Sequence, residues 1–217
     1  MRGARSVLPL LVCACVLSAC NDDGDAPGEG TGAPKAAAVC GATDSSAAPQ
    51  AVFVSATGSD DSGCGTSTAS ACKSLQQGID NCAAPGCAVF VRHGLYATSA
   101  TIKLRDGISV HGSCRFDGEA DRQYRTVLNA APAPGTPAVG ADGVNRPTVF
   151  DGFVVIGKDE TAGGSASIAM AVSNSKGLTL TRSVLVAGRG GRKPVTQCGG
   201  QKRHKISSDG CSILRLA

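Results

Sequence analysis

The sequence has few aromatic residues, and this restricts how a core can form. Tryptophan is absent and aromatic residues make up 3% of the 217 residues, so any core has to be built from aliphatic side chains. After the first 20 residues, no segment is apolar enough to span a membrane. Ser/His/Asp spacings, P-loops and dinucleotide fingerprints are missing too. The body therefore shows none of the common sequence signs of a membrane span or a nucleotide-binding enzyme.

The net charge of +4 comes from one end of the chain. Residues 189–217 hold seven basic residues against a single acidic one, Asp209. The other 14 basic and 16 acidic residues lie in residues 1–188, so the body is mildly acidic. A basic chain can indicate nucleic acid or anionic lipid as a partner, but here the basicity belongs to one segment. We expect no nucleic-acid partner.

Residues 1–19 are predicted to be a lipoprotein signal peptide. Two arginines precede an apolar run that is shorter than the roughly 20 residues of a spanning helix. Residues 17–20 (Leu-Ser-Ala-Cys) then resemble a bacterial lipobox. The resemblance implies that Cys20 is acylated after cleavage and anchors the protein in the cell envelope, at the outer membrane or cell surface. The alternative is an ordinary secretory signal in which Cys20 lies near the cut by chance.

Eight cysteines remain after the signal peptide and Cys20 are set aside: Cys40, Cys64, Cys72, Cys82, Cys87, Cys114, Cys198 and Cys211. An exported chain reaches an oxidising compartment, where such a set predicts disulfides before metal ligands. No C-x-x-C pair occurs, and neither His93 nor His111 has a zinc-like spacing to cysteine. We favour Cys64–Cys72 and Cys82–Cys87, which close short loops, and keep Cys40 and Cys114 as further candidates. The connectivity stays open.

Composition divides the mature chain into a tether, a folded domain and a tail. Residues 20–50 are rich in Ala, Gly, Asp, Ser and Pro, and are predicted to be a flexible, lipid-anchored tether. Residues 51–188 form the predicted domain, with a short helix over residues 73–82 whose apolar residues lie on one face. Short strands separated by glycine turns follow, in a chain with 29 glycines. They are predicted at residues 51–54, 88–92, 101–104, 108–111, 126–128, 148–156, 168–172, 178–180 and 184–186.

The spacing of these strands favours a solenoid over a β-sandwich. Phe153 and Leu178 are 25 residues apart, which suggests a recurrence of 20–25 residues with three short strands per period. A sandwich would have longer strands and hairpin turns such as Asn-Gly, and the sequence contains no Asn-Gly. The sequence thus predicts an all-β chain folded as a solenoid.

Three motifs resemble the opening of pectin-lyase-like right-handed parallel β-helix proteins. They are Val-Phe-Val-Ser-x-x-Gly-Ser-Asp at residues 52–60, Cys-Lys-Ser-Leu-Gln at 72–76 and Val-Phe-Val-Arg-x-Gly-x-Tyr at 89–96. Residues 108–112, 150–155 and 174–180 are similar to later rungs. The resemblance covers residues 51–188 and is closest to bacterial β-helix lipoproteins of undefined function. It implies a right-handed parallel β-helix with a short N-terminal capping helix.

The tail departs from that pattern. After Gly188, charge, periodicity and composition change together, and residues 189–217 are predicted to be basic and irregular. A truncated or frame-shifted C-terminal end is our first hypothesis. The alternatives are a basic tail for anionic surfaces and a capping segment held by Cys198 and Cys211.

No catalytic residue or cofactor is predicted. Lyases on the related fold abstract a proton with Lys or Arg beside calcium-binding carboxylates, and hydrolases use clustered aspartates. The charged candidates here are scattered among predicted turns: Arg92, Lys103, Arg105, Asp106, Asp117, Asp151 and Asp159. Residues 58–63 offer oxygen atoms for calcium but lack the EF-hand spacing, so we favour a plain loop. His93 and His111 are expected to be solvated or structural.

Three functions stay open at this point. The first is a non-enzymatic, lipid-anchored β-helix at the envelope that serves as a surface scaffold or as a glycan- or protein-binding module. The second is a polysaccharide lyase or glycoside hydrolase, or a remnant of one. The third is a truncated product without a function. The expected partners are the membrane, through the anchor, and a polysaccharide or other surface proteins.

Overall fold

The structure is a computed structural model that describes residues 37–117, 119, 125–192 and 214–215. These residues form β-strands with almost no helix, which confirms the predicted all-β class. The only α-helix among them, α1 (Leu75–Asp80), lies inside the predicted 73–82 range. The Ser74 hydroxyl caps it by accepting a hydrogen bond from the Gln77 amide at 3.3 Å.

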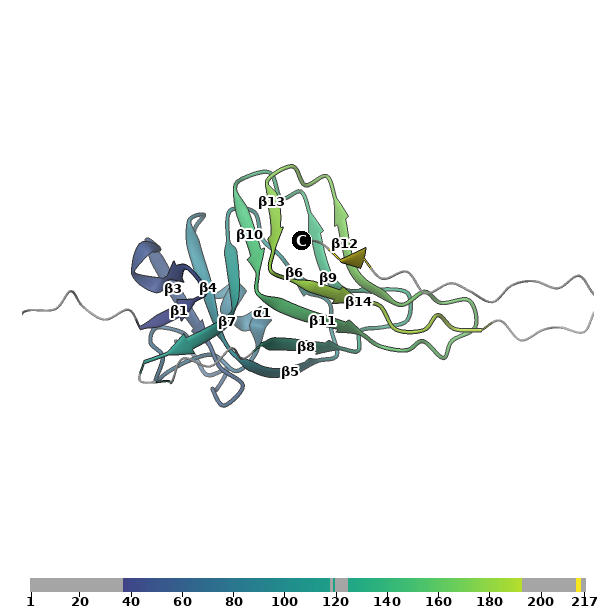
Figure 1. Cartoon of the computed structure of the whole chain (residues 1–217), viewed down its shortest axis with the longest axis horizontal. Coiled ribbons are helices and arrows are strands. Elements are labelled where there is room, and N and C mark those ends of the chain that lie inside the picture. Colours follow the sequence, from purple (N-terminus) through teal and green to yellow (C-terminus); the bar gives the residue numbers. More distant parts are fainter. Residues whose placement is uncertain (1–36, 118, 120–124, 193–213, 216–217) are drawn as a thin grey trace, which may run out of the picture. The chain divides into compact units, whose positions relative to one another are not determined.

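Most strands belong to three sheets (Figure 1). The first sheet contains β3 (Gln50–Val54), β4 (Cys87–Arg92), β7 (Ser109–Phe116), β10 (Thr148–Asp151) and β13 (Leu178–Thr181). The second sheet contains β5 (Gly94–Thr98), β8 (Thr126–Ala130), β11 (Phe153–Gly157) and β14 (Val184–Val186). The third sheet contains β6 (Ile102–Lys103), β9 (Pro137–Asp142) and β12 (Ile168–Ser173). All neighbours within these three sets run parallel.

The chain visits the three sheets in a fixed order. It runs through β4, β5 and β6, then through β7, β8 and β9, then through β10, β11 and β12, and finally through β13 and β14. We call each such set of strands a pass. Each pass therefore adds one strand to every sheet beside the strand of the pass before, until the third sheet ends at β12 among the described residues.

The predicted recurrence of 20–25 residues holds for the first step of the first sheet, where Val89 lies beside Val110, but not for the later steps. In the first sheet Phe150 lies beside Val110 and beside Leu180, which are 40 residues before it and 30 residues after it. Phe153 and Leu178, whose spacing suggested the shorter period, lie on different sheets. The alternation of apolar residues marks most of the strands, but the turns between strands differ in length, so the alternation does not say which strands are neighbours.

The predicted strand over residues 148–156 is two strands joined at a sharp corner. Gly152 separates β10 from β11. Its φ is +77°, a backbone angle that residues with a side chain rarely adopt. A Cβ atom at Gly152 would lie 2.6 Å from the carbonyl oxygen of Gly112 in the pass before. The close approach of the two backbones, together with the left-handed φ, requires glycine here and turns the chain from the first sheet to the second.

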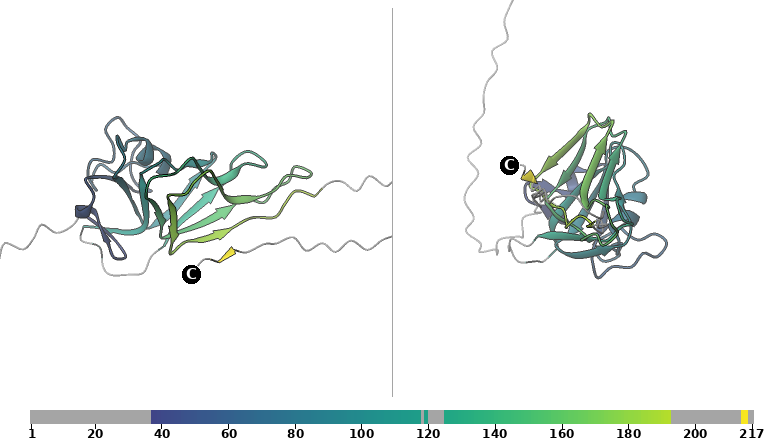
Figure 2. Two further views of the ribbon diagram at one scale, coloured as in Figure 1. Left: turned by 90° about the horizontal axis from the view of Figure 1, so that it is seen from above. Right: turned by 90° about the vertical axis from the view of Figure 1, so that its right-hand side faces the viewer.

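One hydrophobic core lies between the three sheets, which curl around it in the end view of Figure 2. Its side chains form ladders across the passes, such as Val89, Val110 and Phe150 in the first sheet. Phe150 and Phe153 are fully buried, and their rings stack with centroids 4.4 Å apart. The core is thus mainly aliphatic, as predicted, but two of the few phenylalanines form its centre.

The folded part begins before the predicted boundary at residue 51. β1 (Ala38–Cys40) pairs antiparallel with β7 and with β2 (Thr43–Asp44), and the 3-10 helix η1 (Ser45–Ala47) follows. These residues cover a second, smaller core around Phe53, Phe90 and Phe116. The prediction of a tether over residues 20–50 is therefore wrong for its last part. Small residues such as Ala38 gave no sign of burial, because the contacts that bury them are distant in sequence.

Backbone hydrogen bonds to the preceding pass continue past Gly188, where an irregular tail was predicted, although residues 189–192 form no strand. The carbonyl oxygen of Arg189 accepts from the Glu160 amide at 2.8 Å, and the Gly191 amide donates to the Ser165 carbonyl at 2.8 Å. Near the C-terminus, β15 (Leu214–Arg215) pairs antiparallel with β14. The remainder of the predicted tail lies outside the described residues, as do the signal peptide, Cys20, Cys198 and Cys211.

Candidate functional site

Three disulfides join the six cysteines of the described residues. They are Cys40–Cys114, Cys64–Cys72 and Cys82–Cys87. The last two are the pairings favoured from the sequence. Cys40–Cys114 spans 74 residues and ties β1 to β7. Sequence spacing finds the two short loops but says nothing about the long one, because its cysteines meet only when the sheet forms.

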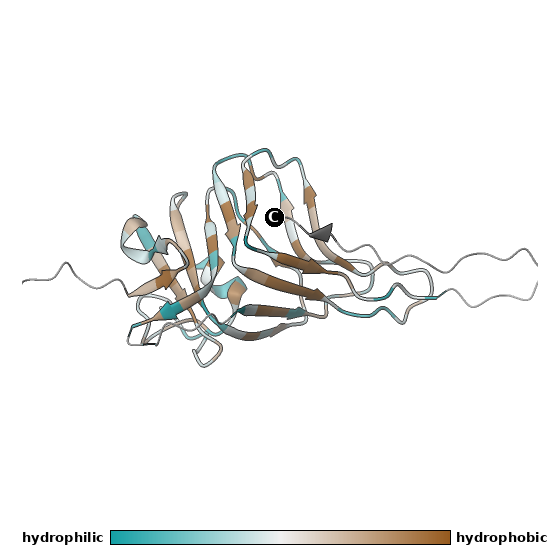
Figure 3. Cartoon of the chain, in the orientation of Figure 1, coloured by the Kyte–Doolittle hydropathy of each residue, from teal (hydrophilic) through white to brown (hydrophobic). Residues whose placement is uncertain are grey.

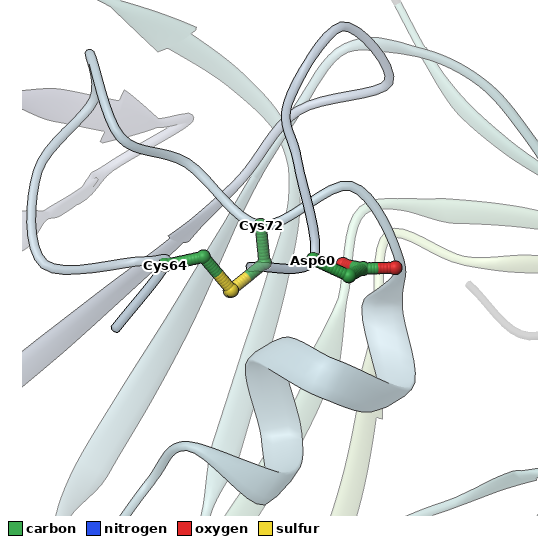
Figure 4. Close-up of side chains that lie close together, drawn as sticks. All are labelled: Asp60, Cys64 and Cys72. Atoms are coloured by element: carbon green, nitrogen blue, oxygen red, sulfur yellow. A yellow bond between two sulfur atoms is a disulfide. The ribbon is translucent and has the colours of Figure 1, made fainter. Parts of the chain in front are cut away.

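The loop over residues 58–63 places Asp60 beside the Cys64–Cys72 disulfide (Figure 4). The sulfur atoms of a disulfide offer no thiolate, which is the form of cysteine that binds metals. One oxygen of Asp60 accepts hydrogen bonds from the Lys73 and Ser74 amides, both at 2.9 Å. In this arrangement Asp60 fixes the chain at the start of α1.

Asp151 and His111 lie together at the corner between the first two sheets. Both are buried, and His111 Nδ1 is 3.7 Å from Asp151 Oδ2. The His111 ring stacks on Phe90 at 5.5 Å between centroids. Arg182 forms an ion pair with Asp151, and its Nη2 also donates to the Cys40 carbonyl at 3.2 Å. The cluster thus connects three passes with the N-terminal strand β1.

The charge of Asp151 is well compensated. Burial by itself raises the pKa of this carboxyl, but contacts from His111, Arg182 and Thr181 outweigh burial and hold the pKa well below its usual range. Thr181 Oγ1 donates to Asp151 Oδ1 at 2.8 Å. The carboxylate has its acceptor positions filled by groups of the next pass, so its role is to hold neighbouring passes together. It is more than the simple turn residue that Asp-Gly predicted.

The other charged candidates do not meet at one place. Asp106 accepts from the Asn145 and Arg146 amides at 2.8 and 2.6 Å. Arg92 pairs with Glu119. His93 lies beside Arg92, with its Nδ1 3.5 Å from the same Glu119 and 3.2 Å from the Cys114 carbonyl oxygen. The remaining candidates lie elsewhere: Arg105 donates to carbonyls at the end of α1, Asp159 accepts from the Arg189 amide, and Asp117 follows β7. Apart from Arg92 and His93, which share Glu119, these candidates lie apart from one another.

Lys103 is different, because it lies in a groove on the outer face of the third sheet. The groove has a volume of about 450 Å³ and crosses all three strands of the sheet. Lys103, Gly140 and Ala171 line it from β6, β9 and β12, and register places them side by side. Because Gly140 and Ala171 are small, they form the floor of the groove, and polar side chains stand beside this floor.

Asp142 and Ser173 form the next row of the groove. They are register partners, and the Ser173 hydroxyl donates to Asp142 Oδ1 at 2.7 Å. Asn174 Nδ2 donates to the same oxygen at 3.2 Å. These hydrogen bonds lower the pKa of Asp142 and keep the exposed carboxylate charged. The groove therefore offers an ammonium group, a carboxylate and a hydroxyl around a flat floor.

Sequence reasoning found Lys103 but missed the rest of the groove. The strand β9 (Pro137–Asp142) was not predicted, since proline and glycine interrupt its apolar pattern. The signal that would have found it is the small residue at Gly140 between the buried Val139 and Ala141.

No helix in the described part of the chain is long and apolar enough to cross a membrane. Comparison with known protein families, curated proteins and solved structures finds no match to the chain.

Proposed function

We propose that the protein is a lipid-anchored, right-handed parallel β-helix that binds a glycan in the groove of the third sheet, without an enzymatic activity. The observation that carries the proposal is the groove itself. Its floor of Gly140 and Ala171 lets a sugar ring approach the backbone, and Lys103, Asp142 and Ser173 supply donors and acceptors for hydroxyl groups. Because the row continues from one pass to the next, an extended polymer fits it better than a single small molecule.

The order of the strands supports the β-helix. The three passes from β4 to β12 each place a strand on the first, second and third sheets in turn, and all neighbouring strands in these sets are parallel. Connections between parallel strands of one sheet are right-handed in about 98% of cases, which supports the right-handed form. α1 contributes Leu75 and Ile79 to the core at the N-terminal end, as a capping helix would.

A steric variant tests the groove. Gly140→Leu fills its floor, and the fold has room for the change, because a Cβ atom there meets only Thr101 Cγ2 at 3.4 Å. Thr179→Leu places the same side chain at an exposed position of the first sheet and serves as the control. On an array of bacterial and plant glycans, the native protein and the control should bind the same polymers, and Gly140→Leu should lose at least tenfold in affinity. Equal binding by all three proteins would refute the groove as the site.

The presence of Lys103 in the groove supports a second candidate, a polysaccharide lyase. The lysine would abstract a proton from a uronate bound across the strands, with Asp142 nearby. Incubation with uronate polymers should then release unsaturated sugars that absorb in the near ultraviolet, and Lys103→Ala should abolish the release. Binding without any release, in the presence or absence of added calcium, favours the non-enzymatic module.

The anchor has a test of its own. Labelled palmitate should enter the native protein, and Cys20→Ser should remove both the label and the membrane association. Cys13→Ser, a change inside the predicted signal peptide, should leave the labelling unchanged. Labelling of Cys20→Ser would contradict the predicted lipoprotein.

A further inference from the structure

The three sheets differ in how their edges near α1 are covered. In the first sheet, the Phe53 amide donates to the Gly65 carbonyl and its carbonyl accepts from the Cys72 amide, both at 2.9 Å, so β3 is covered. In the third sheet, the Lys103 amide of β6 donates to Gln76 Oε1 at 2.8 Å. Two of the three edges thus have polar partners supplied by the chain.

The edge strand of the second sheet is β5, and its outer side is open. The Gly94 amide donates to the Arg125 carbonyl at 3.1 Å, which directs that residue toward β8. Backbone groups alternate in direction along a strand, so the N–H and C=O groups of Leu95 and Ala97 point away from β8. Within the described ranges, no strand pairs with that side of β5.

A groove of about 490 Å³ lies along this open edge. One wall is β5 itself, from Leu95 to Thr98, and the other is formed by Ala56, Asp60 and residues 73–76 at the start of α1. Leu95 is 63% exposed, more than any other large apolar residue in the described part of the chain. An exposed leucine beside a free strand edge is a feature that natural sheets usually avoid.

The groove carries little net charge. Asp60 and Lys73 lie on the same wall, with opposite charges, and Asp60 also accepts hydrogen bonds from the chain at the start of α1. The inner lining is apolar and consists of Leu75, Ile102 and Leu128, which are all buried. The groove therefore fits an uncharged ligand that combines backbone hydrogen bonds with aliphatic side chains.

We propose that the open edge of β5 binds an extended peptide segment of a partner protein, which joins the second sheet as an additional strand. The main chain of the peptide would bond to the outward N–H and C=O groups of Leu95 and Ala97. Alternate aliphatic side chains of the peptide would lie in the groove, against Leu95 and Leu75. This site is separate from the glycan groove of the third sheet and does not depend on it.

A single strand fits this place better than a second copy of the protein. The groove has a wall on each side, so a lone peptide can enter between them. Two copies that paired through β5 would bring the loop at Ala56 and the start of α1 of each copy against those of the other. A peptide strand supplies hydrogen-bond partners to the outward N–H and C=O groups of β5 at regular spacing, and a free sugar does not.

A proline variant removes one outward donor without changing the sheet. The Ala97 amide does not face β8, so Ala97→Pro keeps the pairing of β5 with β8 and prevents a peptide from accepting that bond. Leu95→Lys places a charge in the groove. Ile156→Lys adds the same charge to an exposed position of β11 outside the groove and is the matched control.

The probe is a displayed library of random dodecapeptides, selected on the immobilised native protein. We expect enrichment of uncharged peptides with Val, Ile or Leu at alternate positions, and at least tenfold weaker binding of the synthesised peptide to Ala97→Pro and Leu95→Lys. Binding to Ile156→Lys should be unchanged. The bound peptide should slow hydrogen exchange at the Leu95 and Ala97 amides by at least tenfold and leave the Gly94 amide unchanged.

Three results would overturn the proposal. The first is that selection of the library on the native protein enriches no such peptide compared with selection on Ala97→Pro. The second is a selected peptide whose binding is the same for Ala97→Pro, since it would then use another surface. The third is a native protein that is dimeric in light scattering and becomes monomeric in Ala97→Pro, which would assign the edge to a second copy. Circular dichroism of each variant establishes that the sheets are intact.

Discussion

The two ends of the stacked sheets are stabilised in different ways. The end formed by β1, β3, β4, β7 and α1 has three disulfides and the smaller hydrophobic core, in addition to its share of the larger one. The last pass, β13 and β14, has no disulfide among its described residues, and its apolar side chains Leu178, Leu180 and Leu185 are only half-buried. The N-terminal end is thus fixed by covalent bonds and distant contacts, whereas the last pass depends on the pass beneath it.

This difference explains how a chain with few aromatic residues forms a core. Stacked passes contribute to stability mainly through contacts with their nearest neighbours. A pass in the middle gains from both sides, as Phe150 does between Val110 and Leu180. A terminal pass gains from one side only, so its strands should open first. Figure 3 shows that β11 and β14 are both hydrophobic along their length, although β14 is much less buried.

The largest effect is expected from the disulfide that spans 74 residues. The double variant Cys40→Ser and Cys114→Ser should lower the free energy of unfolding by about 4.5 kcal/mol, because the unfolded chain gains a long open loop. Urea denaturation followed by circular dichroism measures the change. The control is Cys82→Ser with Cys87→Ser, whose loop spans 5 residues and for which the same relation gives about 2 kcal/mol. Equal losses in the two double variants would contradict the explanation that the stabilisation grows with the length of the closed loop.

Core truncation should separate the middle passes from the last one. Phe153→Ala removes a fully buried ring that stacks on Phe150, and should lower the free energy of unfolding by about 4 kcal/mol. Leu185→Ala, in the neighbouring strand of the last pass, should lower it by only about 1 kcal/mol, because that side chain is half-exposed. Chemical denaturation of both variants tests the comparison. A Leu185→Ala loss as large as that of Phe153→Ala would show that the last pass is buried in solution.

The Asp151 cluster predicts a dependence on pH. Because the pKa of Asp151 is lowered in the folded protein, its ionised form adds stability at pH values above the ordinary aspartate pKa, about 3.9. That contribution is lost as the pH falls from about 4 toward the lowered value. Asp151→Asn should therefore be less stable than the native protein by roughly 2 kcal/mol at pH 7, and the difference should shrink below about pH 4. A difference that stays constant down to pH 2 would contradict the assigned role of the carboxylate.

The smallest effect is expected at an exposed ion pair. Asp106→Asn weakens its pairing with Arg146, whose side chain is 61% exposed. Water screens such pairs, so the melting temperature should change very little. Thermal unfolding at low and high salt measures it, and a fall as large as that of Asp151→Asn would show that the turn at Asp106 is a major link between passes.

Local structure was predictable because local patterns determine it. The helix at α1, the strands from β3 to β14 that alternate apolar residues, and the two short disulfides all follow from neighbouring residues. β5 and β9 were missed, because Gly94 and Pro137 begin them and small residues replace the aliphatic ones. Those two strands contain the proposed peptide edge and most of the proposed glycan groove, so both proposed sites lie where the hydrophobic pattern is weakest.

Contacts between distant residues were not predictable. The Cys40–Cys114 disulfide, the pairing of β1 with β7 and the Asp151–Arg182 ion pair each require the sheets to form first. The predicted recurrence failed for a related reason. The alternation of apolar residues inside a strand does not reveal how long the turns between passes are. Sequence patterns identify the strands, and the register between passes brings Lys103 beside Gly140 and Ala171.

The most direct test is an NMR map of the native protein titrated with the glycan that it binds best on the array. We expect the largest amide shift changes at the groove residues of the third sheet: Lys103, Gly140, Asp142, Ala171 and Ser173. The amides of Leu95 and Ala97, at the separate edge of the second sheet, should not shift. Shift changes centred on β5, or on no part of the third sheet, would contradict the proposed glycan site.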